Sequence, residues 1–147
     1  MNEAQERAQV VQEALSWLGT PYAHRGRIKG AGVDCGQFVA LVFEAAGLVG
    51  HIEPDAYPHD WHMHRGEERY LGTVEAYAHQ IQGDPQPGDI VLYRYGRCIS
   101  HGAIVVQWPQ IIHSWVEAGV VLDDALANQD MAARFTGAWS LWPRGGE

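Results

Sequence analysis

The chain has 147 residues, of which 46% are hydrophobic and 19% are charged, and its formal net charge is −8. This composition is typical of a globular domain and excludes a disordered tail, a coiled coil and a collagen-like chain. Because 18 acidic residues outnumber 10 lysines and arginines, the charge balance argues against a nucleic-acid partner and against a polybasic membrane anchor. We therefore expect one domain over residues 1–147.

Compartment and redox state follow from short sequence features. No apolar run reaches the roughly 18 residues that a membrane span needs. The first residues lack a basic start followed by an apolar run, so we expect synthesis in the cytoplasm without a signal peptide. The two cysteines, Cys35 and Cys98, are too few for a disulfide framework and are expected to be free thiols.

The first half of the chain predicts helices. One is expected over Ala4–Leu18, because apolar residues recur there at steps of four and three, on one face formed by Ala4, Ala8, Val11, Leu15 and Leu18. A loop follows that ends at Val33, with five glycines in the stretch Gly19–Gly36. Asp34 is a good N-cap for a second helix over Cys35–Ala46, which Gly47 would end. A third helix is expected over Glu67–Gln80.

The second half changes to short β-branched and aromatic runs, which predict strands. Because the runs are closely spaced, we expect antiparallel neighbours, with a short helix over Asp124–Ala133. The expected strands are Ile90–Tyr95, His101–Gln107, Gln110–Val116, Gly119–Leu122 and Phe135–Trp142. Helices first and strands second predict an α+β fold with the helices packed on one side of the sheet.

Three residues form a candidate catalytic constellation. Cys35 would lie in the first turn of its helix, where the helix dipole favours the nucleophilic thiolate. His101 opens an apolar strand and would be the base that takes the thiol proton. His113 lies on the next strand, from which it would orient His101. Taken singly, each residue fits a plainer role, as a buried cysteine, a solvated strand-end histidine and an ordinary cross-strand histidine.

Five segments in order resemble the NlpC/P60 cell-wall peptidases, a family of papain-like cysteine hydrolases. Together they span nearly the whole chain. The segments are ALSWLGTPY (Ala14–Tyr22), VDCGQFVALVFEAAGL (Val33–Leu48), PQPGDIVLY (Pro85–Tyr93), SHGAIVV (Ser100–Val106) and IIHS (Ile111–Ser114). The resemblance implies N-terminal helices packed on a mostly antiparallel sheet of five to six strands.

The resemblance also assigns roles to residues. Cys35 matches the family nucleophile, His101 the general base and His113 the residue that orients the base. Tyr22 matches a tyrosine that lines the cleft near the thiol. Asp34 matches an aspartate that helps to bind the amino end of the substrate.

One position departs from the family pattern. The usual Asp-Cys-Ser-Gly motif is replaced here by Asp34-Cys35-Gly36-Gln37. Because the serine is missing, the peptide specificity stays open, whereas the nucleophile and the base are both present. Gly36 permits close backbone approach, which suits an oxyanion held by main-chain N–H groups, so we count it among the substrate-binding residues.

The resemblance implies hydrolysis of an amide in the peptidoglycan stem peptide through a thioester, commonly at the bond between γ-D-glutamate and a diamino acid. It implies no cofactor and no metal. Within the family the chain is most similar to phage tail members, on the apparent lack of a signal peptide and of a wall-anchoring repeat, and on the segment Asp60–Leu71. That similarity implies phage tail proteins as partners and a location in the virion, with action at the bacterial cell wall.

Other residues allow competing interpretations. Cys98 and His101 form a Cys-x-x-His pair, but a structural zinc site needs four ligands, so we expect Cys98 to be a bystander near the cleft, or to form a regulatory bridge with Cys35. A cluster of His59, His62 and His64, near Asp55 and Asp60, is either a metal site or a solvated surface segment.

The six tryptophans divide into two expected groups. We expect four in the core, namely Trp17, Trp115, Trp139 and Trp142. Trp61 and Trp108 fall in predicted loops and are either incidental or at the border of the cleft.

Two alternatives to a wall peptidase remain open at this stage. One is a structural tail-assembly module that keeps the fold without activity, against which the presence of Cys35, His101 and His113 argues. The other is a papain-like amidase that acts on a substrate outside the wall.

Overall fold

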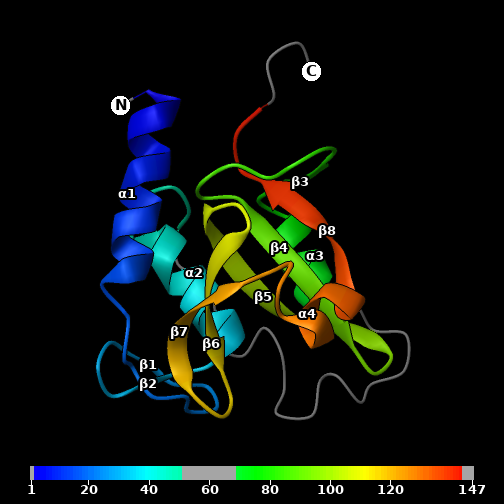
Figure 1. The fold of residues 1–147 in the computed structure, drawn as a ribbon. Coiled ribbons are helices and arrows are strands. Elements are labelled where there is room, and N and C mark those ends of the chain that lie inside the picture. The colour runs from blue at the N-terminus through cyan, green and yellow to red at the C-terminus, as the bar shows by residue number, and fades with distance from the viewer. Residues whose placement is uncertain (1, 51–68, 144–147) are drawn as a thin grey trace.

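The computed structural model describes residues 2–50 and 69–143. Its elements, in chain order, are α1 (Glu3–Leu15), β1 (Arg27–Ile28), β2 (Gly32–Val33), α2 (Cys35–Ala45), α3 (Arg69–Glu75), β3 (His79–Ile81), β4 (Ile90–Tyr95), β5 (Cys98–Gln107), β6 (Gln110–Trp115), β7 (Gly119–Asp124), α4 (Gln129–Arg134) and β8 (Phe135–Ser140). Figure 1 shows the first helices on one side of a central sheet and β3 with β8 at its far end. Among the helices in the described ranges, none is long and apolar enough to cross a bilayer.

The main sheet has six strands in the described residues, in the order β3-β8-β4-β5-β6-β7, and all the neighbours are antiparallel. The expected succession from β4 to β7 is confirmed, because each of these strands pairs with the next along the chain. The last strand, β8, does not extend this succession. It returns to the other edge of β4, where Ile90 pairs with Trp139.

Several predicted elements differ from the structure. The first helix ends at Leu15 rather than Leu18, and β5 begins at Cys98 rather than His101. The strand β7 extends to Asp124 rather than Leu122, and β8 ends at Ser140 rather than Trp142. The third helix ends at Glu75, and His79–Ile81 forms β3 against β8. The short last helix begins at Gln129, where Asn128 is its N-cap, and Asp124 still belongs to β7. The glycine-rich loop contains a small hairpin of β1 and β2. At the end of the predicted third helix, backbone pairing with β8 outweighs the local helical pattern.

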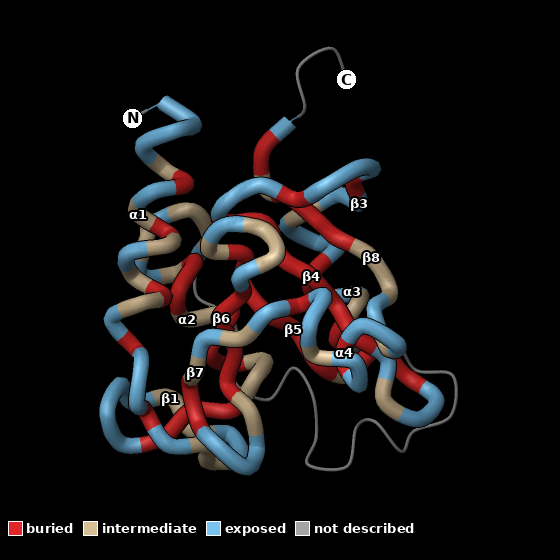
Figure 2. Tube along the Cα trace, in the orientation of Figure 1, coloured by how far each residue is buried: buried red, intermediate tan, exposed pale blue. Residues whose placement is uncertain are grey.

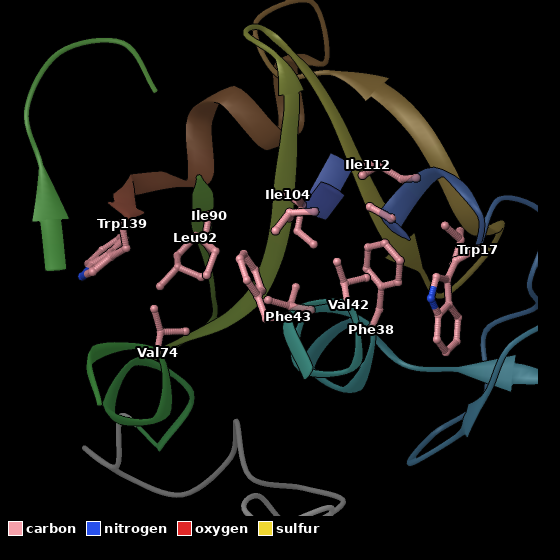
Figure 3. Close-up of a cluster of buried hydrophobic side chains, with 14 of the residues drawn as sticks. Trp17, Phe38, Val42, Phe43, Val74, Ile90, Leu92, Ile104, Ile112 and Trp139 are labelled. Carbon is pink, nitrogen blue, oxygen red and sulfur yellow. The ribbon is translucent and has the colours of Figure 1, made fainter. Parts of the chain in front are cut away.

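One face of the sheet is covered by α1, α2 and α3. Phe38, Val42 and Phe43 of α2 point toward Ile104 and Ile112 of the sheet (Figure 3). Burial of each such side chain contributes about 1.5–3 kcal/mol. This contact holds α2, and with it Cys35 at its first residue, against β5 and β6.

The opposite face carries α4, so the expectation that all helices lie on one side is wrong for this element. Met131 of α4 and Ala125 join Tyr93, Val105 and Ile111 of the sheet in a second buried cluster. Figure 2 shows the buried segments concentrated in β4, β5 and β6 between the two layers. The central strands are covered on both faces, which explains their nearly continuous apolar runs.

The buried face of α1 differs from the predicted one. Arg7, Val10 and Ala14 are buried in the helix, whereas Ala4 and Ala8 are exposed. The helix is therefore rotated so that an arginine lies inward. Arg7 Nη1 makes an ion pair of 2.8 Å with the fully buried Asp89, and a pattern search limited to apolar residues cannot find such a face.

The outer edge of β7 is partly covered by the segment that follows α1. Val120 N–H donates to Thr20 O at 2.9 Å, and Gly19 N–H donates to Val120 O at 3.1 Å. Gly119 begins β7 with a φ of +76°, and a Cβ there would overlap the Thr20 carbonyl. A glycine is therefore required for this close approach.

Candidate functional site

Cys35 is placed by the N-cap of α2, as the sequence predicts. Asp34 Oδ1 accepts the Gln37 N–H at 2.7 Å, and its Oδ2 accepts the Arg25 N–H at 2.8 Å. Ser114 Oγ of β6 donates to Val33 O at 2.8 Å, just before the cap. These bonds fix the start of α2 against the sheet. The Cys35 thiol donates to Ser100 O at an S···O distance of 3.6 Å, and the residue as a whole is half-buried.

The structure brings His101 and His113 together. His101 Nε2 lies 2.7 Å from His113 Nδ1. Their rings come from the neighbouring strands β5 and β6, and both are buried, with exposures of 4% and 1%. At 2.7 Å the two nitrogens share one proton, so one ring donates and the other accepts.

A pocket of about 130 Å³ opens beside these groups. Cys35 and His101 both line it, so the predicted nucleophile and base face a common space. Three aromatic residues form much of the remaining wall. The lining residues are Tyr22, Cys35, Tyr95, Ser100, His101, Ser114, Trp115 and Val116. No lysine, arginine, aspartate or glutamate is among them, so the pocket suits a neutral segment of a substrate.

The resting thiol is neutral, which corrects the expectation of a thiolate favoured by the helix dipole. Burial, followed by the negative charge of Asp34, raises the pKa of Cys35 to about 12. Backbone N–H groups of Gly36, Cys35 and Gly102 act in the opposite direction and lower it. The N–H groups of the helix start are present as predicted, but desolvation and the adjacent carboxylate outweigh them.

Alkylation of Cys35 is expected to be slow at neutral pH. With a pKa of about 12, the thiolate fraction at pH 8 is about one part in ten thousand. Iodoacetamide labelling of the native protein, followed by peptide mass mapping, should therefore show Cys35 reacting more slowly than in the urea-unfolded chain. Its rate should still increase above pH 9.

The fully buried Cys98 is the internal reference for this experiment, because only unfolding should expose it. A His101→Ala variant should label at the wild-type rate if no thiolate–imidazolium pair is present at rest. Half-maximal labelling of Cys35 below pH 8 would contradict the neutral thiol.

Both histidines are neutral at physiological pH. Burial, with a further contribution from His113, lowers the pKa of His101 well below its usual value. Burial also lowers the pKa of His113, and the nearby Asp123 acts in the opposite direction. A neutral imidazole has one free lone pair, which is what a general base requires.

The remaining predicted site residues lie close to the thiol. Tyr22 lines the pocket, and burial, followed by the neighbouring ionisable groups of Cys35 and Asp34, raises its pKa. Gly36 follows Cys35 in the first turn of α2. Asp34 is buried, and both its carboxylate oxygens accept backbone N–H groups. Its expected contact with a substrate amine stays a prediction.

Several residues of the site were not found by sequence reasoning. Trp115, expected in the core, is half-buried and packs edge-on against His101 with ring centroids 5.3 Å apart. Tyr95 packs against the same ring at 6.0 Å. Asp123 of β7 lies with Oδ2 3.3 Å from His113 Nε2. The alternation of side chains along β7 was the available signal, since it places Asp123 on the same face as Val121, which pairs with His113.

The competing interpretations fare differently. Cys98 lies in β5 rather than in a loop, is a free thiol like Cys35, and does not line the pocket. Across residues 2–50 and 69–143, no group of three or more potential ligands could hold a metal ion. Trp108 packs on Phe135 at 6.0 Å, in the cluster beneath α4. The cluster of His59, His62 and His64, with Asp55, Asp60 and Trp61, lies outside the described residues.

Three further tryptophans are buried as expected, with exposures of 6% or less. They are Trp17, Trp139 and Trp142.

Curated relatives match most of this chain but only a part of their own length. A protein named "probable endopeptidase" from Mycobacterium tuberculosis is 33% identical over 113 residues, which are 74% of this chain and 23% of that protein. A protein with the same name from Mycobacterium bovis matches to the same extent. The chain thus spans about a quarter of the length of these relatives.

Solved structures share the fold at low identity. An NlpC/P60 family protein from Bacillus cereus has a TM-score of 0.67 and 20% identity, over 93% of this chain and 40% of that one. The NlpC/P60 domain of the peptidoglycan hydrolase SagA has a TM-score of 0.63 and 21% identity, over 91% and 97%. The model of the NlpC/P60 family itself matches residues 19–140, which contain every residue of the site described above, and the chain therefore belongs to the NlpC/P60 family.

Proposed function

We propose that this chain is a cysteine peptidase that hydrolyses an amide bond in the peptidoglycan stem peptide, between γ-D-glutamate and the diamino acid that follows it. The observation that carries the proposal is the pocket that Cys35, at the start of α2, shares with His101, a buried neutral histidine paired in turn with His113. We further propose that residues 1–147 act as one catalytic domain.

The first step forms a thioester. Because the thiol and His101 are both neutral at rest, the Sγ–H proton moves to His101 as the sulfur attacks the carbonyl carbon. The resulting oxyanion is placed near the backbone N–H groups at the start of α2, those of Cys35 and Gly36. The C–N bond then breaks, and His101 returns the proton to the leaving amine.

The second step releases the acid. His101 takes a proton from water, whose oxygen attacks the thioester carbonyl. The C–S bond breaks, and the proton returns to the sulfur of Cys35. The products are one free carboxylic acid and one free amine for each water consumed, and the thiol is regenerated without an oxidant, a metal or a cofactor.

The choice of substrate rests on family membership and on the relatives. The mycobacterial relatives are named as endopeptidases and SagA as a peptidoglycan hydrolase. The described lining of the pocket, which is aromatic and has no charged side chain, fits the methylene chain that a γ-glutamyl segment presents next to the scissile amide.

Purified stem peptides provide the test. A disaccharide tetrapeptide is incubated with the protein, and the products are separated by liquid chromatography and identified by mass. We expect a disaccharide dipeptide that ends in D-glutamate, together with a dipeptide that begins with the diamino acid. The Cys35→Ala variant should give neither.

A peptide of the same composition with an α-linked glutamate is the matched substrate control, and it should be cleaved at least about tenfold more slowly. Equal cleavage of both linkages would contradict specificity for the wall peptide and would favour a general amidase. If the stem peptides stay intact after long incubation with folded protein, the result would favour the alternative of a structural module that keeps the fold without activity.

We also propose a biological setting, namely a component of a phage or prophage tail that is made in the cytoplasm and acts at the bacterial cell wall. The similarity of the sequence segment Asp60–Leu71 to tail-associated members supports this setting. Residues 60–68 of that segment lie outside the described structure.

A further inference from the structure

Asp123 lies next to the histidine pair but outside the pocket. It is the fifth residue of β7, and its Oδ2 lies 3.3 Å from His113 Nε2. The same oxygen accepts Asn128 Nδ2 at 2.9 Å, and Oδ1 accepts the Asp124 N–H at 2.8 Å. These bonds hold the carboxylate in one orientation, with one oxygen toward the ring of His113.

The three side chains form a line across three neighbouring strands. Asp123 pairs with Ile111, and His113 follows Ile111 by two residues, so Asp123 and His113 lie on the same face of the sheet. His101 lies four residues before Val105, which also pairs with Ile111, and so shares that face. The line runs from β7 through β6 to β5, and Cys35 lies in the pocket at its end.

The carboxylate decides which nitrogen of His113 carries the proton. An ionised carboxylate only accepts hydrogen bonds, so it favours the proton on Nε2 of His113. A neutral ring then has a lone pair on Nδ1, which accepts from His101 Nε2 across 2.7 Å. His101 is left with its own lone pair on Nδ1, the nitrogen that remains to take the thiol proton.

The opposite arrangement cannot catalyse. With the proton on Nδ1 of His113, the Nε2 lone pair would face the negative charge of Asp123. His113 would donate to His101 Nε2, and the proton of His101 would lie on its Nδ1. With Nδ1 of His101 already protonated, this nitrogen cannot accept the proton of the Cys35 thiol.

Other titratable groups around the two rings are neutral or lie on the substrate side. They are Cys35 of α2, which lines the same pocket as His101, and Tyr93 and Tyr95 of β4, whose rings lie 6.0 Å from that of His101. Asp130 and Arg134 of α4 act on Tyr95. Among the described residues, Asp123 is thus the carboxylate within 4 Å of a nitrogen of either ring.

We propose that Asp123 is a positioning residue that sets the tautomers of His113 and His101, so that His101 presents an unprotonated Nδ1 to Cys35. This inference rests on the proposed function for its catalytic consequence, but the tautomers themselves are independent of the substrate. The same carboxylate also stabilises the positive charge that His101 and His113 share once the thiol proton has been transferred.

Ring-nitrogen NMR of histidine-labelled protein at pH 7.5 tests the tautomers directly. We expect both His101 and His113 to be protonated on Nε2, with signals assigned from His101→Gln and His113→Gln variants. In Asp123→Asn the preference for Nε2 of His113 should weaken, and the second tautomer should appear. A wild-type His113 protonated on Nδ1 would overturn the proposal whatever the activity.

Kinetics on the stem peptide give the second readout. For Asp123→Asn we expect kcat to fall at least about 100-fold with KM within about threefold, and the acid limb of the kcat profile to move to lower pH, because the group that raises the pKa of His113 is lost. Asp123→Glu should restore part of kcat. A merely structural role would lower the folded fraction without moving the pH limb.

Asp124→Asn is the matched control. It removes the same charge one residue away, and the Asp124 carboxylate caps the N–H groups of Leu126 and Ala127 instead of facing His113. We expect its kcat to stay within about threefold of wild type. Equal losses in both variants would overturn the proposal. If NMR shows the expected tautomers but the protein cleaves no stem peptide, the proposed function is refuted and the tautomer assignment stands.

Discussion

Replacement of Cys35 by alanine is expected to reduce hydrolysis of the stem peptide by at least about 10⁴-fold, because Cys35 supplies the one thiol among the described residues that line the pocket with His101. Turnover is measured by chromatography of the released amine. The fold should remain intact, since Cys35 is half-buried and the cap of α2 depends on Asp34. Circular dichroism and thermal unfolding of the variant check this point.

Cys98→Ala is the matched control for the loss of a thiol. Cys98 is fully buried in β5 and lies outside the pocket, so the variant should lose stability but keep its kcat within a few fold. The opposite result, with Cys98 essential and Cys35 dispensable, would overturn the assignment of the nucleophile.

Because the thiol and the base act in one step, their effects should not add. His101→Ala alone is expected to cost about 10²–10⁴-fold, the usual range for a general base. The double variant Cys35→Ala/His101→Ala should be no slower than Cys35→Ala, since the base has no proton to accept once the thiol is absent. An additional loss in the double variant would indicate that His101 has a separate role in binding.

Replacement of Arg7 by methionine is expected to lower the free energy of unfolding by about 3–5 kcal/mol, because it removes the guanidinium that balances the charge of the buried Asp89 carboxylate. Asp89 is fully buried, and Arg7 Nη1 lies 2.8 Å from its Oδ1. The guanidinium also donates to Pro87 O at 2.8 Å and lies 4.3 Å from the ring centroid of Trp142. Urea unfolding followed by fluorescence measures the loss.

The matched control is Arg134→Met. Arg134 forms an ion pair with Asp130 at 3.2 Å, but the two side chains are 38% and 62% exposed, so loss of this ion pair should cost less than about 1 kcal/mol. A second variant, Arg7→Met with Asp89→Asn, should recover part of the stability, since the amide oxygen can still accept the Gln86 N–H while the buried charge is removed. A loss below about 1 kcal/mol for Arg7→Met would contradict the prediction.

Elements that carry their own local signals were predicted well. Helix α2 was predicted to within a residue, because Asp34 caps its start and Gly47, with a φ of +79°, ends it. Strand β4 matches its predicted range, and the succession to β7 follows from short connections. The return of β8 to β4 joins residues nearly 50 positions apart, such as Ile90 and Trp139, and no local pattern encodes it.

The residues of the site also divide into those predicted from the sequence and those that were missed. Cys35, His101 and His113 were proposed from residue type and position, and the structure brings the two histidines to 2.7 Å and places Cys35 in the pocket with His101. Asp123 was missed because aspartate is depleted in strands, so the predicted strand ended at Leu122. The neutral state of the thiol was also missed, since its cause is burial, which becomes visible only when α2 has packed on the sheet.

The hydrogen bonds between Val120 and the segment after α1 have a consequence for behaviour in concentrated solution. β7 is an edge strand, and its free backbone groups could otherwise pair with a second copy of the chain. Gly19 and Thr20 occupy the groups of Val120, and two carboxylates, Asp123 and Asp124, end the strand. The segment that brings Tyr22 to the pocket thus also protects the sheet from growing by edge-to-edge aggregation.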